Sequence, residues 1–200
     1  MVRVIAGAFK SRVLKTLEGR LTRPTSDRLK ESLFNILRDR IGGSNFLDCF
    51  AGSGAIGIEA LSRGAVHAVF VESNARAARV ILENCRRLGL ERHADYHLID
   101  QPVEPALRML GQVGTKFDIV FLDPPYDASD EYSRVLGRLS ALDIVKTEGW
   151  VIAEHSRRKM IELAGTRFRC FRQIRQGDSI LSFFRLNADT EDGQADPTKA

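Results

Sequence analysis

The stretch Phe117–Tyr126, FDIVFLDPPY, decides the fold. A short run of Ile, Val, Phe and Leu is typical of a strand buried in a parallel sheet. We expect this strand to end at Asp123, because Pro124 and Pro125 lack an amide hydrogen and have a fixed φ. Ligands bind at the carboxyl ends of the strands in open α/β sheets. The stretch therefore predicts a carboxylate, a free carbonyl group and the ring of Tyr126 around one small site.

Such a site suits a flat ring that carries an amino group. The exocyclic amine of a nucleobase is a poor nucleophile, because its lone pair is delocalised into the ring. If Asp123 and the Pro124 carbonyl each accept one N–H, the lone pair turns toward an electrophile, and the carboxylate stabilises the positive charge that develops on nitrogen. Tyr126 would stack on the base. The alternative is a stiff turn in which Asp123 only caps the chain.

A glycine loop lies upstream, between an apolar strand and a helix. The sequence FLDCFAGSGAIGIEALSRG occupies Phe46–Gly64, and its tight loop is expected over Ala51–Gly54. The glycines match G-x-G-x-x-G at Gly52, Gly54 and Gly57, a spacing that lets a ligand approach the backbone and a helix N-terminus. Glu72 ends the next strand, where it can hold the hydroxyl groups of a ribose. A nucleotide-like cofactor is therefore predicted.

The rest of the chain alternates apolar and amphipathic segments. Strands are expected over residues 46–50, 67–71, 95–99, 117–122, 150–154, 167–175 and 180–186. Helices are expected over residues 27–41, 55–63, 74–88, 103–110 and 130–142. This order predicts the α/β class, with a doubly wound, seven-stranded, mostly parallel sheet. We divide the chain into a basic N-terminal hairpin and helix (1–45), an α/β domain (46–186) and a disordered acidic tail (187–200).

Composition limits the class of protein. A chain of 200 residues with 44% hydrophobic and 28% charged residues is ordinary for one globular domain. It contains neither an apolar run long enough for a membrane helix nor a signal peptide, so we expect a cytoplasmic protein that makes no membrane contact. The three cysteines and four histidines lack the spacing of metal ligands, and we expect neither a disulfide nor a metal.

Positive charge is concentrated near both ends. Residues 1–30 contain eight Lys and Arg against two acids, and residues 157–185 also contain eight against two. Scattered charge usually means only a solvated face, but two basic segments around a base-sized site favour a nucleic acid partner. The candidate phosphate contacts are Lys10, Arg12, Arg172 and Arg175.

The combination of motifs resembles a known family. DxFAGSGAxG at Asp48–Gly57, followed by Glu72 and DPPY, is similar to the S-adenosylmethionine-dependent methyltransferases that modify exocyclic amines. RPTSDRLKESLFNIL at Arg23–Leu37, with LSRGA at Leu61–Ala65 and EHS at Glu154–Ser156, resembles the bacterial family that methylates N2 of a guanine in small-subunit (16S) ribosomal RNA. The resemblance covers residues 2–186.

The resemblance implies a cofactor, S-adenosylmethionine, that is released as S-adenosylhomocysteine, and no metal. It implies that the methionine part of the cofactor is surrounded by Asp48, Ala51, Gly52 and Gly54. Glu72 would hold the ribose, and Asp100 would face the adenine, although Gln101 and Pro102 follow Asp100 where the family usually has Gly-Asp-Ala.

The same resemblance implies where the substrate lies. The guanine amine would be taken by Asp123, Pro124, Pro125 and Tyr126, with Arg23 and Thr25 near the mouth of the site. The guanine would be number 966 in the usual numbering of the RNA. The partner would be ribosomal RNA, naked or within a small ribosomal subunit that is partly or fully assembled, and the enzyme would act as a monomer.

Three alternatives stay open. The amine could belong to adenine, as N6 in a nucleic acid, because the site needs only an amine on a flat ring. An NAD(P)-dependent oxidoreductase would share the glycine loop and Glu72, but it leaves DPPY and the basic ends unexplained. A non-catalytic RNA-binding module would explain the basic segments but not the cofactor loop.

Overall fold

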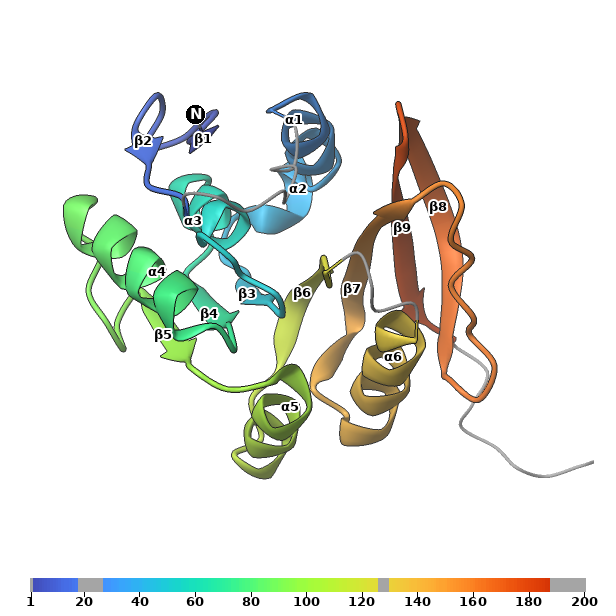
Figure 1. Cartoon of the computed structure of the whole chain (residues 1–200). Coiled ribbons are helices and arrows are strands. Elements are labelled where there is room, and N and C mark those ends of the chain that lie inside the picture. Colours follow the sequence, from blue (N-terminus) through green and yellow to red (C-terminus); the bar gives the residue numbers. More distant parts are fainter. Residues whose placement is uncertain (1, 18–26, 126–129, 188–200) are drawn as a thin grey trace, which may run out of the picture.

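The computed structural model describes residues 2–17, 27–125 and 130–187. Seven strands form one sheet in the order β5-β4-β3-β6-β7-β9-β8 (Figure 1). They are β3 (Asn45–Asp48), β4 (His67–Val71), β5 (Tyr96–Ile99), β6 (Phe117–Leu122), β7 (Val145–Ser156), β8 (Phe168–Gln176) and β9 (Ser179–Leu186). Strands β3 to β7 pair in parallel, whereas β9 is antiparallel to both β7 and β8. The predicted α/β class with a mostly parallel seven-stranded sheet is confirmed.

Helices cover both faces of the sheet. One face carries the small hairpin of β1 (Val2–Arg3) and β2 (Val13–Leu14), together with α1 (Asp27–Ile36), α2 (Arg38–Ile41), α3 (Ala55–Ser62) and α4 (Ala75–Arg87) (Figure 1). We call it the hairpin face. The opposite face carries α5 (Val103–Gln112) and α6 (Glu131–Leu142). Each face has its own buried apolar cluster, so the sheet is covered on both sides, as parallel sheets require.

Two elements differ from the sequence-based expectation. The N-terminal helix is divided into α1 and α2, because Leu37 has ψ −2°, far from the α-helical value of about −42°. Strand β7 begins at Val145, five residues before the expected start. Its first residue pairs with Phe117, and the register then shifts before Trp150 pairs with Ile119. The polar residues between Val145 and Trp150 hide this irregular start from a search for apolar runs.

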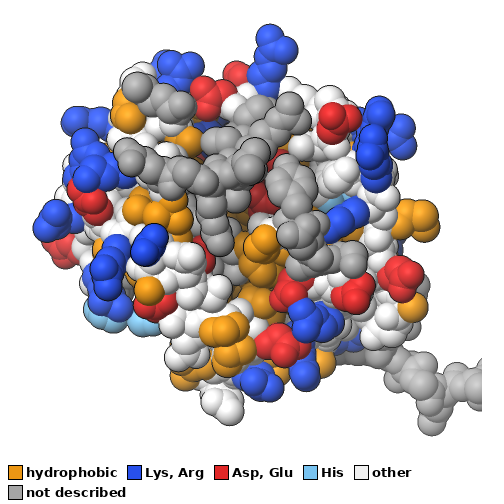
Figure 2. All heavy atoms as spheres, in the orientation of Figure 1, with side chains coloured by type: hydrophobic (Ala, Val, Ile, Leu, Met, Phe, Trp, Pro, Cys, Tyr) orange, Lys and Arg blue, Asp and Glu red, His pale blue; other side chains and the backbone are white. Residues whose placement is uncertain are grey.

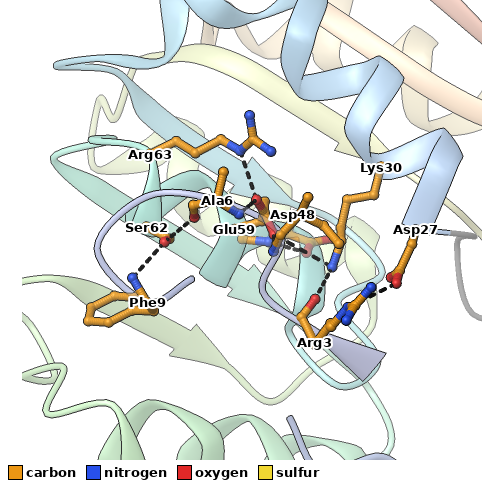
Figure 3. Close-up of polar contacts among 11 residues, drawn as sticks. Arg3, Ala6, Phe9, Asp27, Lys30, Asp48, Glu59, Ser62 and Arg63 are labelled. Atoms are coloured by element: carbon orange, nitrogen blue, oxygen red, sulfur yellow. Dashed lines mark hydrogen bonds and ion pairs between the residues drawn. The ribbon is translucent and has the colours of Figure 1, made fainter. Parts of the chain in front are cut away.

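A buried carboxylate joins the N-terminal hairpin to α3 (Figure 3). Glu59 of α3 is fully buried and accepts hydrogen bonds from the amides of Ile5 (2.7 Å) and Ala6 (3.0 Å). Arg63 Nε donates to the same carboxylate at 2.7 Å, and Lys30 Nζ of α1 lies 3.5 Å from it. A buried charge is tolerated only when it is paired and hydrogen-bonded. The hairpin, α1 and α3 are therefore fixed to one another at this charge.

Candidate active site

Asp48 positions the glycine loop from beneath. It is the last residue of β3, it is 2% exposed, and its Oδ2 accepts a hydrogen bond from the amide of Gly57 at 3.2 Å. Gly57 lies in the first turn of α3, whose N-cap residue, Gly54, has no side chain to bind the free amides. A carboxylate from the neighbouring strand therefore takes over the usual role of the N-cap side chain. Asp48 fixes the loop against the start of α3.

The environment of Asp48 disfavours its charge. Burial, with a smaller contribution from the negative charge of Glu72, raises the pKa of Asp48 to about 7, although the hydrogen bond from Gly57 acts in the opposite direction. The carboxyl group thus changes its charge near neutral pH rather than in acid.

Glu72 holds the other side of the loop. It follows β4, is half-buried, and accepts hydrogen bonds from the amides of Gly52 (Oε2, 2.8 Å) and Asn74 (Oε1, 2.7 Å). Each carboxylate oxygen has a second lone pair, so Glu72 can still accept from a hydroxyl group of a ligand. No atom among the described residues lies within 4 Å of where a side chain of Gly52 would begin. A ligand can therefore approach the loop backbone there.

The remaining cofactor candidates end adjacent strands. The amide of Ala51 donates to the carbonyl of Val71 at 3.0 Å, which ties the loop to β4. Asp100 follows β5 and is exposed. Strands β3, β4 and β5 are neighbours, so Asp48, Glu72 and Asp100 line one edge of the sheet.

Asp123 lies beside Glu154. Leu122 of β6 is in register with Ala153 of β7, so the next residue of each strand is a carboxylate, and both point to the hairpin face. Burial raises the pKa of Asp123 well above its ordinary value, and the negative charges of Glu154 and Asp48 raise it further. Glu154 is 8% exposed and accepts from Ser179 Oγ at 3.4 Å. Three carboxylates from adjacent strands thus converge.

Glu154 is the site residue that reasoning from the sequence missed. It was seen only as part of the EHS motif, although its place at the end of an apolar strand resembles that of Asp123. Pro124 is buried and Pro125 is exposed. Tyr126, Arg23 and Thr25 lie outside the described residues.

His155, the next residue, faces away from these carboxylates. Gln173 Nε2 donates to Ser182 Oγ at 2.9 Å, and the same oxygen lies 2.7 Å from His155 Nε2. His155 Nδ1 lies 3.1 Å from the Ser156 carbonyl oxygen, which can only accept, so Nδ1 carries a proton. Burial lowers the pKa of His155, and both ring nitrogens have a partner, so His155 is a satisfied core residue. In the three described ranges no group of three or more His, Cys, Asp or Glu side chains could hold a metal.

The structure sorts the basic residues into different roles. Lys10 and Arg12 are exposed in the loop of the hairpin and make no ion pair with a described residue. Lys30 is buried against Glu59 instead of facing solvent. Arg172 pairs with Phe183 and Arg175 with Ile180, so the two arginines point to opposite faces of the sheet and do not form one patch. Figure 2 shows Lys and Arg side chains around the rim of the visible surface.

Comparison with known proteins places the chain among methyltransferases. A family model described as Conserved hypothetical protein 95 matches residues 2–185. A Bacillus subtilis protein, YlbH, named provisionally as an rRNA methyltransferase, is 40% identical over 78% of this chain and 83% of its own. Ribosomal RNA small subunit methyltransferase D is 38% identical in Escherichia coli and 42% in Haemophilus influenzae. These two alignments cover 62% of this chain and 60% and 64% of those proteins, less than two thirds of their length.

Solved structures agree over nearly the whole chain. A protein described provisionally as the methyltransferase yhhF of Escherichia coli superposes with a TM-score of 0.80 at 27% identity, covering 94% of this chain and 98% of that one. Hypothetical protein TTHA0928 of Thermus thermophilus gives 0.80 at 31% identity, over 93% and 100%. In the described part of the chain no helix is long and apolar enough to cross a membrane. The chain has the α/β methyltransferase fold and belongs to the family described as Conserved hypothetical protein 95, which confirms the resemblance stated from the motifs.

Proposed function

We propose that this protein transfers a methyl group from S-adenosylmethionine to the exocyclic N2 amine of a guanine in small-subunit ribosomal RNA. The relatives named Ribosomal RNA small subunit methyltransferase D support the RNA as substrate. The observation that carries the choice of amine is the placement of two carboxylates side by side: half-buried Asp123, which follows β6, and buried Glu154 near the end of β7. Guanine 966 is the proposed position.

The cofactor is proposed to lie over the glycine loop. Asp48, Ala51, Gly52 and Gly54 surround its methionine part, Glu72 accepts from the ribose hydroxyl groups, and Asp100 faces the adenine. Hydrogen bonds from Gly52 to Glu72 and from Gly57 to Asp48 support this assignment, because they hold the loop open for a ligand before one binds. The cofactor supplies an electrophilic methyl group on a positively charged sulfur.

The amine is proposed to be oriented by Asp123 and the carbonyl group of Pro124. Each accepts one N–H, which turns the nitrogen lone pair toward the methyl group. A bond forms between nitrogen and carbon as the bond between carbon and sulfur breaks, S-adenosylhomocysteine leaves, and one amine proton passes to solvent. Asp123 stabilises the positive charge on nitrogen during the transfer. Tyr126 stacks on the base and Pro125 stiffens the turn.

Glu154 favours guanine over adenine. Guanine presents two adjacent donors on its Watson–Crick edge, N1–H and the N2 amine, and two adjacent carboxylates can accept from both. Adenine presents its amine beside the N1 lone pair, which a second carboxylate repels. Specificity of this kind comes from leaving the wrong partner with an unfavourable buried contact. An adenine N6 amine stays the second candidate target.

The enzyme is proposed to act as a monomer in the bacterial cytoplasm, where ribosomal RNA is found, on naked RNA or within a small subunit that is partly or fully assembled. Residues 1–45 would face the RNA through Lys10 and Arg12, with Arg23 and Thr25 near the mouth of the site and Arg172 as a further contact. Arg175 points to the opposite face of the sheet, so it is not proposed as a contact. The exposed positions of Lys10 and Arg12 support this arrangement.

The test is nucleoside mass spectrometry of 16S ribosomal RNA after incubation with the enzyme and labelled S-adenosylmethionine. We expect N2-methylguanosine from the parent and a rate lower by about 10²–10³ for Asp123→Ala, since one preorganised partner is lost. Asp123→Asn keeps an acceptor and should retain more activity. Asp39→Ala, an exposed carboxylate of α2, is the matched control. Transfer to adenine, or full activity of Asp123→Ala, would contradict the proposal.

Two further variants separate the roles of neighbouring side chains. Tyr126→Phe keeps the stacking ring and should remain active, whereas Tyr126→Ala should not. Glu154→Gln should slow methyl transfer to guanine. It should also reduce the preference for guanine over adenine, because an amide can donate a hydrogen bond to adenine N1. If Tyr126→Phe and Tyr126→Ala lost the same methyl-transfer activity, the phenol oxygen and not the ring would be the group that positions the base.

A further inference from the structure

A surface at the β8 end of the sheet combines arginines with aromatic rings on the hairpin face. It consists of Arg40, Trp150, Arg169, Phe171, Arg172 and Arg185, and we call it the arginine–aromatic surface. The two rings are partly buried, and all four arginines are exposed. These residues come from α2, β7, β8 and β9, so no single motif of the sequence contains them.

The rings hold two of the guanidinium groups in place. The ring centres of Trp150 and Phe171 lie 4.9 Å apart, and the two rings meet edge to face. Both rings also contact the buried ring of Phe183. Arg40 Cζ lies 4.2 Å from the centre of the Trp150 ring, and Arg185 Cζ lies 5.3 Å from that of Phe171. Nη1 of Arg40 also donates to the carbonyl of Glu148 at 3.0 Å. These guanidinium groups are thus partly ordered before any ligand binds, which reduces the entropy lost on binding.

Among the described residues, no acidic side chain pairs with the positive charges of this surface. Arg169 of β8 is directly opposite Arg185 of β9, and such like-charged cross-strand pairs are destabilising. Arg172, opposite Phe183, adds a third positive charge to the same face. Within the described ranges none of the four arginines has a carboxylate within 4 Å, whereas Arg157 on the loop after β7 pairs with Asp178. Unfavourable charge that folding does not explain indicates an anionic partner.

We propose that the arginine–aromatic surface binds the single-stranded part of the RNA substrate beside the target guanine. Phosphate oxygens accept from the guanidinium edges, and bases stack on the guanidinium planes of Arg40 and Arg185, a mode common in recognition of single-stranded RNA. Trp150 and Glu154 are on the same face of β7, four residues apart, so the surface lies about 13 Å from the amine site. This inference rests on the proposed function, and it extends that function by assigning a position to the flanking nucleotides.

The test uses the only tryptophan of the chain, Trp150, as its own reporter. A single-stranded oligoribonucleotide that carries the target guanine is titrated into the intact protein without cofactor, and the tryptophan fluorescence is followed at several salt concentrations. We expect quenching that weakens with salt. The double variant Arg169→Gln, Arg185→Gln should bind several-fold more weakly, with the salt slope reduced by about 0.7 for each lost phosphate contact.

The double variant also separates binding from folding. Because it removes a like-charged pair, its urea midpoint should match or exceed that of the parent while its RNA affinity falls. Arg108→Gln, exposed on α5 of the opposite face, is the matched control and should bind RNA as the parent does. Unchanged fluorescence on RNA binding, or equal affinity of the double variant and the parent, overturns the inference.

The outcome for the proposed function is read separately. If the protein forms N2-methylguanosine but the fluorescence of Trp150 does not change on addition of RNA, the inference fails and the proposed function stands. If Trp150 responds but no methylated guanosine forms, the proposed function fails. Quenching by intact small subunits but not by protein-free ribosomal RNA would assign the surface to a ribosomal protein and contradict RNA as its occupant.

Discussion

The carboxylate of Glu72 accepts a hydrogen bond from the amide of Gly52 at 2.8 Å, across the end of the sheet. Its other oxygen accepts from the amide of Asn74, the N-cap of α4, at 2.7 Å. One side chain therefore holds the glycine loop, the end of β4 and the start of α4 together. These contacts lie within the protein itself, so a contact with a cofactor ribose would add to them.

Replacement of Glu72 should weaken cofactor binding through the loop. Glu72→Ala removes two hydrogen bonds to a charged group, so we expect affinity for S-adenosylhomocysteine to fall roughly tenfold to a hundredfold, measured by titration calorimetry. Glu91→Ala, an exposed side chain before β5, is the control and should bind as the parent does. Unaltered affinity of Glu72→Ala would remove the loop from the cofactor site.

Asp48 should make stability depend on pH. Its pKa is raised from an ordinary 3.8 to about 7 in the folded protein, so between these values the folded state holds a proton that the unfolded state releases. The free energy of unfolding therefore falls as pH rises from about 4 to about 7. Asp48→Asn should raise that free energy at pH 8 by up to about 4 kcal/mol, with little change at pH 4.

The measurement is urea denaturation at both pH values. Asp100→Asn, at an exposed carboxyl that follows β5, is the matched control for the substitution. A loss of stability at pH 8 in Asp48→Asn would mean that the charge of Asp48 is needed to hold α3, and that the hydrogen bond to Gly57 outweighs burial.

The close approach of the hairpin to α3 depends on Gly7. Its φ is +84°, and an added methyl group would lie 1.8 Å from the carbonyl oxygen of Ser62. Gly165 has φ +73° with no atom near, so Gly165→Ala measures the cost of the backbone conformation alone, about 1–2 kcal/mol. Gly7→Ala should lose a further 1–3 kcal/mol of unfolding free energy through overpacking. Equal losses in the two variants would show that the hairpin moves freely from α3.

Gly57 of α3 packs directly against the ring of Phe70. An added methyl group would lie 2.3 Å from that ring, so Gly57→Ala should destabilise the protein by about 1–3 kcal/mol. Gly137→Ala in α6, where no described atom is near, should instead stabilise it by about 1 kcal/mol through helix propensity. Calorimetric melting of the double variant Gly57→Ala, Phe70→Leu should show partial recovery, and purely additive losses would argue against a clash.

Much of the architecture was predictable because it depends on local pattern. Apolar runs and caps give the strands and helices, and the predicted ranges agree with the structure to within a few residues for the central elements. Glu72 and Asp123 were identifiable because ligands bind where parallel strands end, whereas Asp48 and Asp100 came from the family resemblance. The sequence could also have predicted that Arg172 and Arg175 point in opposite directions, because residues three apart on a strand lie on different faces of the sheet.

What the sequence determined by itself is the order of strands and helices, the glycine loop and the acids that end the strands, because each depends on neighbours a few positions away. Only the tertiary structure decided which distant groups meet. The register of β6 and β7 brings Glu154 beside Asp123. Lys30 of α1 is buried against Glu59 of α3. The guanidinium group of Arg40 lies over the ring of Trp150. Such contacts depend on how whole elements pack, and no local pattern of side chains contains that information.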